Sequence, residues 1–248
     1  MNRADADPNA AAQGAAAVIP AAGAGVRMGA DRPKQFLTIE GKPLLALTLE
    51  AFEQCGAVAA VVLVVPEDAV EDCELEMVRG LGFTKVRQVV PGGARRQDSV
   101  RQGVEACPDA CDVVVVHDGV RPLVRPELIE RAVFGAREHG AVVAALPAKE
   151  TVKEVASDGR VRRTLDRGSL WLVQTPQAFR RLDLLEAHRT ALQEGWGEMS
   201  DDALLLETAG LPVHVIRGAE DNIKVTTPHD LMMARYLLAR RSDGDSGM

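Results

Sequence analysis

Strand-like segments, most of them unbroken runs of apolar residues, alternate along this chain with segments of helical spacing. The predicted strands are AAAVIP at 15–20, AAVVLVVP at 59–66, KVRQVVPGG at 85–93, DVVVVHDG at 112–119 and AVVAALP at 141–147. A strand with one face in water alternates apolar and polar side chains, whereas an unbroken apolar run requires burial of both faces. The pattern therefore predicts an α/β fold, in which a largely parallel sheet carries helices on both of its faces.

Helical spacing of apolar residues fills the stretches between these strands and recurs toward the C-terminus. The predicted helices lie at 43–55, 68–82, 99–107, 126–140, 181–195, 200–210 and 229–241, and a last strand lies at 212–218. Asp98 or Ser99 is the expected N-cap of the helix at 99–107, because both side chains accept hydrogen bonds from the first turn of a helix. The order of elements indicates one doubly wound domain without an internal repeat or an interdomain linker.

The alternation stops between residues 150 and 179, where valines alternate with charged residues around the sequence SDGR. This pattern is typical of a hairpin rather than of a strand–helix–strand unit. We therefore expect a single domain over residues 15–241 with a protruding β-arm at about 150–179. Residues 1–14 are expected to form a disordered tail, and residues 242–248 a flexible C-terminal tail.

Charge and cysteine content narrow the class of protein. The chain carries 29 Lys and Arg against 36 Asp and Glu, a formal net charge of −7, which argues against a general nucleic-acid-binding protein. Its N-terminal residues lack the basic start and apolar stretch of a signal peptide, and no apolar run approaches the roughly 20 residues of a membrane span. The four cysteines have neither a C-x-x-C pair nor zinc-ligand spacing, which favours free thiols in a reducing compartment. These observations predict a cytoplasmic protein that binds neither nucleic acid nor membranes.

The first predicted strand continues into a glycine-rich loop, PAAGAGVRMGADRPKQ, at residues 20–35. Gly23 and Gly25 fit the dinucleotide-binding pattern G-x-G-x-x-G, but Met28 occupies the third glycine position, and the sequence has no G-x-x-x-x-G-K-[ST] motif. Backbone N–H groups of such a loop can surround a triphosphate, and Arg27 and Lys34 can add positive charge. The simpler interpretation is a tight turn whose two cations are only solvated. It accounts for the glycines, but it gives no reason for both cations to follow them.

Polar residues also follow the third and fourth predicted strands, at the carboxyl ends where open α/β sheets bind ligands. The third strand leads to Gly92, with Arg96 and Ser99 near a helix start. The fourth leads to His117 and Asp118, and a carboxylate at the end of a buried parallel strand is a usual holder of a divalent metal. We interpret His117 as a buried polar residue rather than a ligand.

The last strand and the fourth strand contribute further charged residues. Arg121 follows Asp118 by three positions, and the sequence DNIKVT adds Asp221 and Lys224, which are expected to complete a cleft for phosphate and metal. Many cations, one or two carboxylates and glycine turns, without a Ser–His–Asp arrangement, indicate phosphoryl or nucleotidyl transfer by charge neutralisation.

Six sequence blocks, taken together in this order, resemble the 2-C-methyl-D-erythritol 4-phosphate cytidylyltransferase family. They are PAAGAGVRMGADRPKQ, GGARRQDSV, VHDGVRP, TLDRGSLWLVQTPQAF, SDDA and DNIKVT, and the similarity extends from about Val18 to about Leu238. The resemblance implies a Rossmann-like nucleotidyltransferase fold, a homodimer formed through the β-arm and a need for magnesium. It also implies the activity: the acceptor phosphate attacks the α-phosphate of cytidine triphosphate (CTP) in line and releases pyrophosphate, in the non-mevalonate route to isoprenoid precursors.

The resemblance further implies roles for individual residues. Arg27 and Lys34 would stabilise the pentavalent α-phosphate, Asp118 would meet magnesium and substrate hydroxyls, and Lys224 would contact the phosphates. The residues that would line the nucleotide are Ala21, Ala22, Gly23, Gly25, Gly92, Arg96 and Ser99. The residues that would bind the sugar phosphate are Arg121, Thr151, Arg167 and Ser200. Because Thr151 and Arg167 lie on or near the arm, the family pattern places them in the active site of the other subunit of the dimer.

Two alternatives stay open at this point. Ribitol-5-phosphate cytidylyltransferases share the fold and the nucleotide half, and the arm block does not separate the two classes cleanly. A catalytically silent nucleotide-binding module would be expected to lack Arg27 or Lys34, and both are present. The chain departs from the usual family pattern at Gly119–Val120, where two alanines are common, at Ala94–Arg95, where acidic residues are common, and at Ser200, where Thr is more usual.

Overall fold

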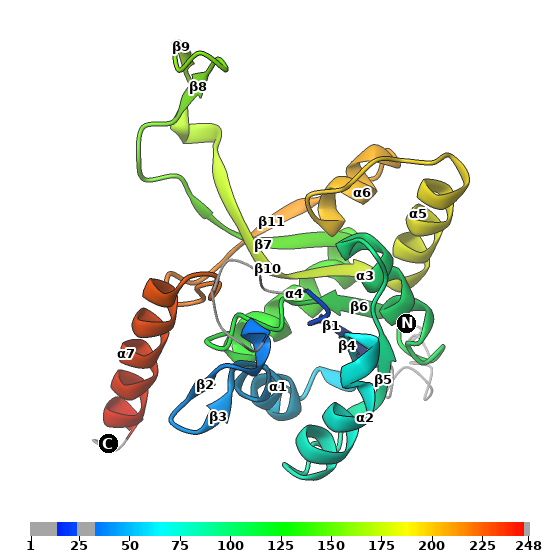
Figure 1. The fold of residues 1–248 in the computed structure, drawn as a ribbon. Coiled ribbons are helices and arrows are strands. Elements are labelled where there is room, and N and C mark those ends of the chain that lie inside the picture. Colours follow the sequence, from blue (N-terminus) through cyan, green and yellow to red (C-terminus); the bar gives the residue numbers. More distant parts are fainter. Residues whose placement is uncertain (1–13, 24–32, 246–248) are drawn as a thin grey trace, which may run out of the picture.

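The computed structural model describes residues 14–23 and 33–245 of the chain. Seven strands form a central sheet (Figure 1). In spatial order they are β11 (His214–Arg217), β7 (Ala141–Pro147), β10 (Trp171–Arg180), β6 (Val113–Val116), β1 (Ala15–Pro20), β4 (Val58–Val65) and β5 (Val86–Pro91). Neighbouring strands are parallel except where β10 pairs with β6 and with β7. The predicted α/β class with a mostly parallel sheet is confirmed.

Helices cover both faces of this sheet (Figure 1). They are α1 (Leu44–Gln54), α2 (Val70–Asp72), α3 (Arg96–Glu105), α4 (Pro126–His139), α5 (Arg181–Gln193) and α6 (Asp202–Thr208). The last helix, α7 (Pro228–Asp245), lies to one side of the sheet. The helix predicted at 68–82 is divided, because α2 lies between a 3-10 turn at Glu67–Ala69 and a π-helical segment at Cys73–Arg79. α7 continues past the predicted domain boundary at residue 241, and the predicted N-terminal tail lies, apart from its last residue, outside the described residues.

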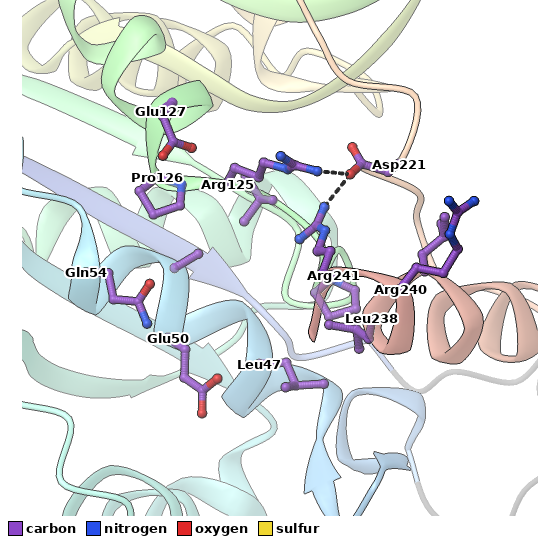
Figure 2. A pocket seen from close by; sticks show the side chains of 14 residues that line it. Leu47, Glu50, Gln54, Arg125, Pro126, Glu127, Asp221, Leu238, Arg240 and Arg241 are labelled. Atoms are coloured by element: carbon purple, nitrogen blue, oxygen red, sulfur yellow. Dashed lines mark hydrogen bonds and ion pairs between the residues drawn. The ribbon is translucent and has the colours of Figure 1, made fainter. Parts of the chain in front are cut away.

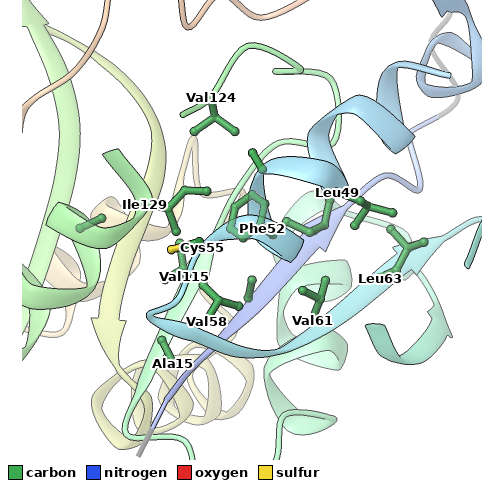
Figure 3. Packing of buried hydrophobic residues seen from close by; sticks show 14 of the residues in the cluster. Ala15, Leu49, Phe52, Cys55, Val58, Val61, Leu63, Val115, Val124 and Ile129 are labelled. Atoms are coloured by element: carbon green, nitrogen blue, oxygen red, sulfur yellow. The ribbon is translucent and has the colours of Figure 1, made fainter. Parts of the chain in front are cut away.

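Strand β1 shows why an unbroken apolar run forms a strand at the centre of the sheet. Successive side chains of a strand point to opposite faces. Ala15, Ala17 and Ile19 pack with α1 and α4 on one face, whereas Ala16 and Val18 pack with α3 and α5 on the other. Figure 3 shows the first of these two clusters, in which side chains of α1 and α4 meet the strands. Both faces of this central strand are therefore buried, as the sequence predicted.

Helix α3 begins earlier than predicted. It starts at Arg96, and Arg95 rather than Asp98 or Ser99 occupies the N-cap position. The Asp98 carboxylate lies one turn into the helix, where it accepts a hydrogen bond from the backbone N–H of Arg95 at 3.2 Å. Asp98 therefore caps the helix from inside the first turn, which is the reciprocal half of a capping box.

The β-arm projects away from the sheet (Figure 1). The predicted hairpin is present at its tip, where β8 (Lys153–Val155) pairs antiparallel with β9 (Val161–Thr164). Strand β10 then returns from the arm into the sheet, and its residues Gln177–Arg180 pair with β6. The end of the segment predicted as arm, from Trp171 onward, thus belongs to the central sheet, and a local hairpin pattern gives no indication of this long-range pairing.

The small hairpin of β2 (Thr38–Ile39) and β3 (Lys42–Pro43) connects the glycine-rich loop to α1. Ile39 of this hairpin joins Leu44, Leu123, Val225 and Ala234 in a third buried cluster, which holds α7 against the domain. Among the helices of the described residues, none combines the length and the apolar character that crossing a membrane would take.

Candidate active site

A cleft of about 400 Å³ lies at the carboxyl ends of β1, β5 and β6. The predicted site residues that line it are Ala21, Ala22, Gly23, Lys34, Arg96, Ser99, Asp118 and Lys224. They come from separate loops, which meet because the carboxyl ends of parallel strands share one edge of the sheet. The structure therefore brings together most of the predicted nucleotide-binding and catalytic residues.

The other predicted residues either are absent from the cleft lining or fall outside the described residues. Gly25 and Arg27 are outside the described residues. Thr151 and Arg167 are exposed on the arm, and Ser200 is exposed just before α6. These last three do not line the cleft of their own chain.

Asp118 is the charged centre of the cleft. Its Oδ2 atom lies 3.0 Å from Lys224 Nζ and 3.2 Å from Arg121 Nε, and the carboxylate is buried. Burial alone would raise the pKa of Asp118, but Lys224, Arg121 and Arg96 outweigh it and hold the pKa below its usual range. Asp118 is therefore a carboxylate at any physiological pH. Arg121, predicted to bind the sugar phosphate, contacts Asp118 but is not part of the cleft lining, and its role in binding stays a prediction.

A metal at Asp118 would take most of its ligands from outside the protein. In the part of the chain that the structure describes, no cluster of three or more His, Cys, Asp or Glu residues could enclose an ion. Mg²⁺ is commonly bound by one or two carboxylates together with substrate phosphates and water, rather than by a protein cage. A single buried carboxylate next to a cation-lined cleft of about 400 Å³ fits this mode of binding.

Glycine is required at position 92, where the loop that follows β5 touches the loop that follows β1. A Cβ atom on Gly92 would lie 2.3 Å from the Ala22 Cβ and 2.9 Å from Ser99 Oγ. Ser99 Oγ also accepts a hydrogen bond from the Gly93 N–H at 3.0 Å. Gly92 thus permits the close approach of the two loops that form one wall of the cleft.

Gln35 fixes the beginning of the glycine-rich loop, a role that the sequence did not suggest. Its buried side chain donates a hydrogen bond from Nε2 to the Ala21 carbonyl at 2.6 Å. This bond joins the 3-10 turn at Lys34–Phe36 to the end of β1. It thereby places Lys34 beside the cleft.

Arg96 is held by a buried partner that the sequence analysis missed. Arg96 NH2 lies 2.8 Å from Asp202 Oδ2, and the Asp202 side chain is only 2% exposed. Burial would lower the pKa of Arg96, but Asp202 and Asp118 raise it, so the guanidinium stays charged. Gln177 accepts hydrogen bonds from the backbone N–H groups of Asp202 and Ala203 and fixes the start of α6. The only sequence signal was the acidic pair in SDDA.

A buried hydrogen-bond network supports Asp118 from behind. Thr175 Oγ1 accepts from the Asp118 N–H at 3.1 Å and lies 3.0 Å from His117 Nδ1, while His117 Nε2 lies 3.3 Å from the Arg121 carbonyl. The Arg121 carbonyl can only accept, so Nε2 carries the proton of a neutral ring, and Nδ1 accepts from the Thr175 hydroxyl. Burial lowers the pKa of His117 to about 4, which agrees with a neutral ring. The interpretation of His117 as a buried polar residue is confirmed.

Asn222 links this network to the loop that carries Lys224. Its side-chain Nδ2 donates to the backbone carbonyl of Thr175 at 2.7 Å, and the backbone carbonyl of Asn222 accepts from Arg121 NH1 at 2.8 Å. Asn222 is fully buried. The loop after β11 is thereby fixed against the base of the cleft.

The prediction that Asp221 completes the cleft is wrong. Its Oδ2 atom accepts from Arg125 NH2 at 2.9 Å and from Arg241 NH2 at 2.6 Å, in a different cavity. The neighbouring Asn222 side chain is buried in the domain, whereas the Asp221 side chain lines the other cavity, so the two side chains point to different sides of the same loop. Which side of the loop each side chain faces depends on packing that the motif DNIKVT does not encode.

Two departures from the family pattern line the cleft. Val120 is 6% exposed there and adds an apolar contact. Arg95 is bound by the Asp98 carboxylate at 2.8 and 2.9 Å, so most of its charge is compensated locally. Neither residue changes the set of cations around Asp118.

Glycine turns, converging cations and one buried carboxylate at the carboxyl edge of a parallel sheet define a nucleotidyltransferase of the Rossmann-like α/β class. The family model for 2-C-methyl-D-erythritol 4-phosphate cytidylyltransferase matches residues 15–240. The chain belongs to this family. It is accordingly a CTP-dependent nucleotidyltransferase of the isoprenoid pathway.

Individual relatives agree with this family. The chain is 46% identical to the 2-C-methyl-D-erythritol 4-phosphate cytidylyltransferase of Pelotomaculum thermopropionicum, over 91% of this chain and 94% of that protein. It is 43% identical to the protein of the same name from Syntrophus aciditrophicus, over 90% and 95%. Among solved structures, 4-diphosphocytidyl-2C-methyl-D-erythritol synthase from Anaerococcus prevotii has a TM-score of 0.80 at 29% identity, covering 92% and 96% of the two chains. The enzyme from Thermus thermophilus has a TM-score of 0.73 at 34% identity, covering 90% and 98%.

Proposed function

We propose that the cleft around Asp118 joins CTP to 2-C-methyl-D-erythritol 4-phosphate. An oxygen of the acceptor phosphate attacks the α-phosphorus, the bond to the bridging oxygen of the β-phosphate breaks, and pyrophosphate leaves. The products are 4-diphosphocytidyl-2-C-methyl-D-erythritol and pyrophosphate. The observation that carries this proposal is the convergence of Lys34, Arg96 and Lys224 on one cleft beside a buried carboxylate.

The chemistry assigned to these residues is electrostatic. Negative charge accumulates on the α-phosphate as the acceptor oxygen approaches, and cations held in position stabilise it without reorganisation. Lys34, fixed beside the loop by Gln35, and Arg27 are assigned to this charge. Lys224 is assigned to the phosphates of CTP, because it reaches the cleft from the loop that Asn222 anchors. No covalent enzyme intermediate is needed.

We further propose that Mg²⁺ is the metal and that Asp118 binds it. When bound, the ion neutralises phosphate charge and orients the triphosphate. The test is a pyrophosphate-release assay with excess chelator, followed by addition of Mg²⁺. Activity should vanish with the chelator and return with the metal, and turnover that continues in excess chelator would contradict this role of Asp118.

The acceptor is decided by the same assay. Pyrophosphate release is measured with CTP and either 2-C-methyl-D-erythritol 4-phosphate or ribitol 5-phosphate. Release with the first acceptor alone is the expected result. Release with ribitol 5-phosphate alone would show that the acceptor is that of the alternative family. Release with neither acceptor would contradict the proposal that the cleft catalyses this reaction. The cytoplasmic location predicted from the sequence stays a prediction.

We also propose that two chains share each acceptor site through the β-arm. Arg167 donates a hydrogen bond to the Lys149 carbonyl at 2.8 Å and, like Thr151, is exposed on the arm. Next to it, Trp171 and Leu172 are 40% and 62% exposed, which leaves apolar surface for a partner to cover. Support for a homodimer comes from this surface and from the arm, which projects away from the sheet and contributes neither Thr151 nor Arg167 to the cleft lining of its own chain (Figure 1).

Mixed dimers of Lys34→Ala and Arg167→Ala subunits test the shared site. If the arm crosses to the partner, each mixed dimer contains one intact site, and random mixing restores about a quarter of the wild-type activity. If each chain uses its own arm, every site lacks one cation and activity stays at the level of the single variants. Failure of recovery in mixtures shown to contain mixed dimers would therefore refute the shared site.

A further inference from the structure

A second cavity lies between α1, the start of α4 and the C-terminal half of α7 (Figure 2). Its volume is about 730 Å³, larger than that of the cleft around Asp118. One wall is apolar and contains Leu47, Ala51, Val124, Leu237 and Leu238. Three arginines, Arg125, Arg240 and Arg241, also line the cavity. Nothing in the assigned chemistry uses this cavity.

The arginines of the cavity already bind an anion, which is a side chain of the protein itself. Arg125 and Arg241 both donate to Asp221 Oδ2, as the dashed lines of Figure 2 show. Burial would raise the pKa of Asp221, but these hydrogen bonds and charges lower it, so Asp221 is a carboxylate. The Nε atom of Arg241 is buried and has no hydrogen-bond partner among the described residues. Arg240, which lines the same cavity, is exposed.

The acidic residues of the cavity do not cancel this group of cations. Glu50, which lines the cavity, is paired at 2.6 Å with Lys42, which does not line it. Asp221 and Glu127 therefore face three arginines, which leaves an excess of one positive charge and an unused buried donor.

We propose that this cavity is a ligand site for an organic anion that joins a phosphate group to a short apolar body. The phosphate would take the place of the Asp221 carboxylate on Arg125 and Arg241 and would also reach Arg240, which is exposed in the same cavity. The apolar body would lie against the wall formed by α1 and α7. A phosphate offers more acceptor oxygens than a carboxylate and binds the arginine fork bidentately.

Displacement of Asp221 connects this site to the cleft. Asp221 is followed directly by Asn222, whose carbonyl accepts from Arg121 at 2.8 Å and whose side chain binds Thr175. Arg121 in turn contacts Asp118. A ligand that releases Asp221 removes one anchor of this loop, and it should lower the rate of nucleotidyl transfer. The effect on turnover rests on the proposed function, whereas the binding does not.

Calorimetric titration with octyl phosphate tests the binding, and CTP with Mg²⁺ at saturating concentration keeps the probe out of the catalytic cleft. Octyl phosphate should bind more tightly than inorganic phosphate or octanol. Arg240→Gln should weaken binding about tenfold, because a charge-assisted hydrogen bond is lost. Asp221→Asn should tighten binding, since the internal competitor is neutralised. Arg87→Gln, which changes an exposed arginine of β5 outside the cavity, is the matched control and should have no effect.

The absence of binding, equal affinity for all four proteins, or loss of binding when CTP is added would overturn the site. Opposite effects of Arg240→Gln and Asp221→Asn cannot arise from general destabilisation, and Arg240 is exposed, so its variant should fold.

The coupling is tested by the pyrophosphate-release assay. Octyl phosphate should lower kcat of the wild type, whereas Asp221→Asn should have a lower kcat that octyl phosphate changes no further. Equal inhibition of both proteins, or inhibition of neither, would overturn the coupling through Asp221. If the wild type releases no pyrophosphate, the proposed function fails, and the calorimetric result still decides whether the site exists.

Discussion

Acidification is expected to destabilise this protein through one buried side chain, His117. Its ring is 0% exposed and lies between Thr175 Oγ1 and the Arg121 carbonyl. Burial lowers its pKa to about 4 in the folded protein, although Asp118 acts in the opposite direction, whereas the ordinary value is 6.5. The unfolded chain therefore binds a proton more readily. The contribution of His117 to stability is fully present above pH 6.5 and is lost as the pH falls from 6.5 to 4.

The magnitude follows from the difference in pKa. A shift from 6.5 to about 4 corresponds to about 3 kcal/mol in the free energy of unfolding. Linkage places about 2 kcal/mol of this loss between pH 7 and pH 5, and the rest below pH 5. This is a large part of the stability of a typical domain, which is about 5–15 kcal/mol.

Urea unfolding of the wild type and of His117→Gln at pH 7, 6 and 5 measures the effect. The two proteins are compared at one concentration, because association shifts apparent stability. Glutamine keeps an amide at the site but does not titrate, so the variant should be less stable at pH 7 and the difference should shrink by about 2 kcal/mol at pH 5. His188, whose pKa burial also lowers, is present in both proteins and cancels. A difference in stability that stays constant from pH 7 to pH 5 would refute the reasoning.

Three further outcomes are expected. Gly92→Ala should lower the free energy of unfolding by about 1–3 kcal/mol and raise KM for CTP, because the added Cβ would meet Ala22. Gly56→Ala, where a Cβ has open space, should do neither. Equal melting temperatures and kinetics for the two variants would contradict the close contact at Gly92. Lys34→Ala should lower kcat by about 10²–10³ with a smaller change in KM, and a change confined to KM in steady-state assays would show a purely binding role. Burial raises the pKa of the Cys107 thiol to about 12, so labelling with a thiol reagent at pH 8 should require unfolding; rapid labelling of the native protein, with Cys107→Ser as control, would contradict its burial.

The layers of the fold and the edge that carries the site could be predicted from the sequence. Apolar runs such as Ala15–Pro20 and Val113–Val116 can be satisfied only by burial on both faces, and this is a property of the local sequence. Glycines and cations that follow such strands must meet, because parallel strands end at the same edge. Lys34, Asp118 and Lys224 were found in this way.

Long-range partners depended on the tertiary structure. Strand β10 inserts antiparallel between β6 and β7, and the pairing of Gln177 with Val116 has no trace in the local pattern around either residue. The same holds for Asp202, which binds Arg96 across the domain, and for Asp221, which binds Arg125 instead of entering the cleft. A sequence pattern specifies which residues must be buried or charged, because burial and charge belong to each residue. Which two buried charges meet depends on how separate elements pack, and that is decided only when the whole chain is folded.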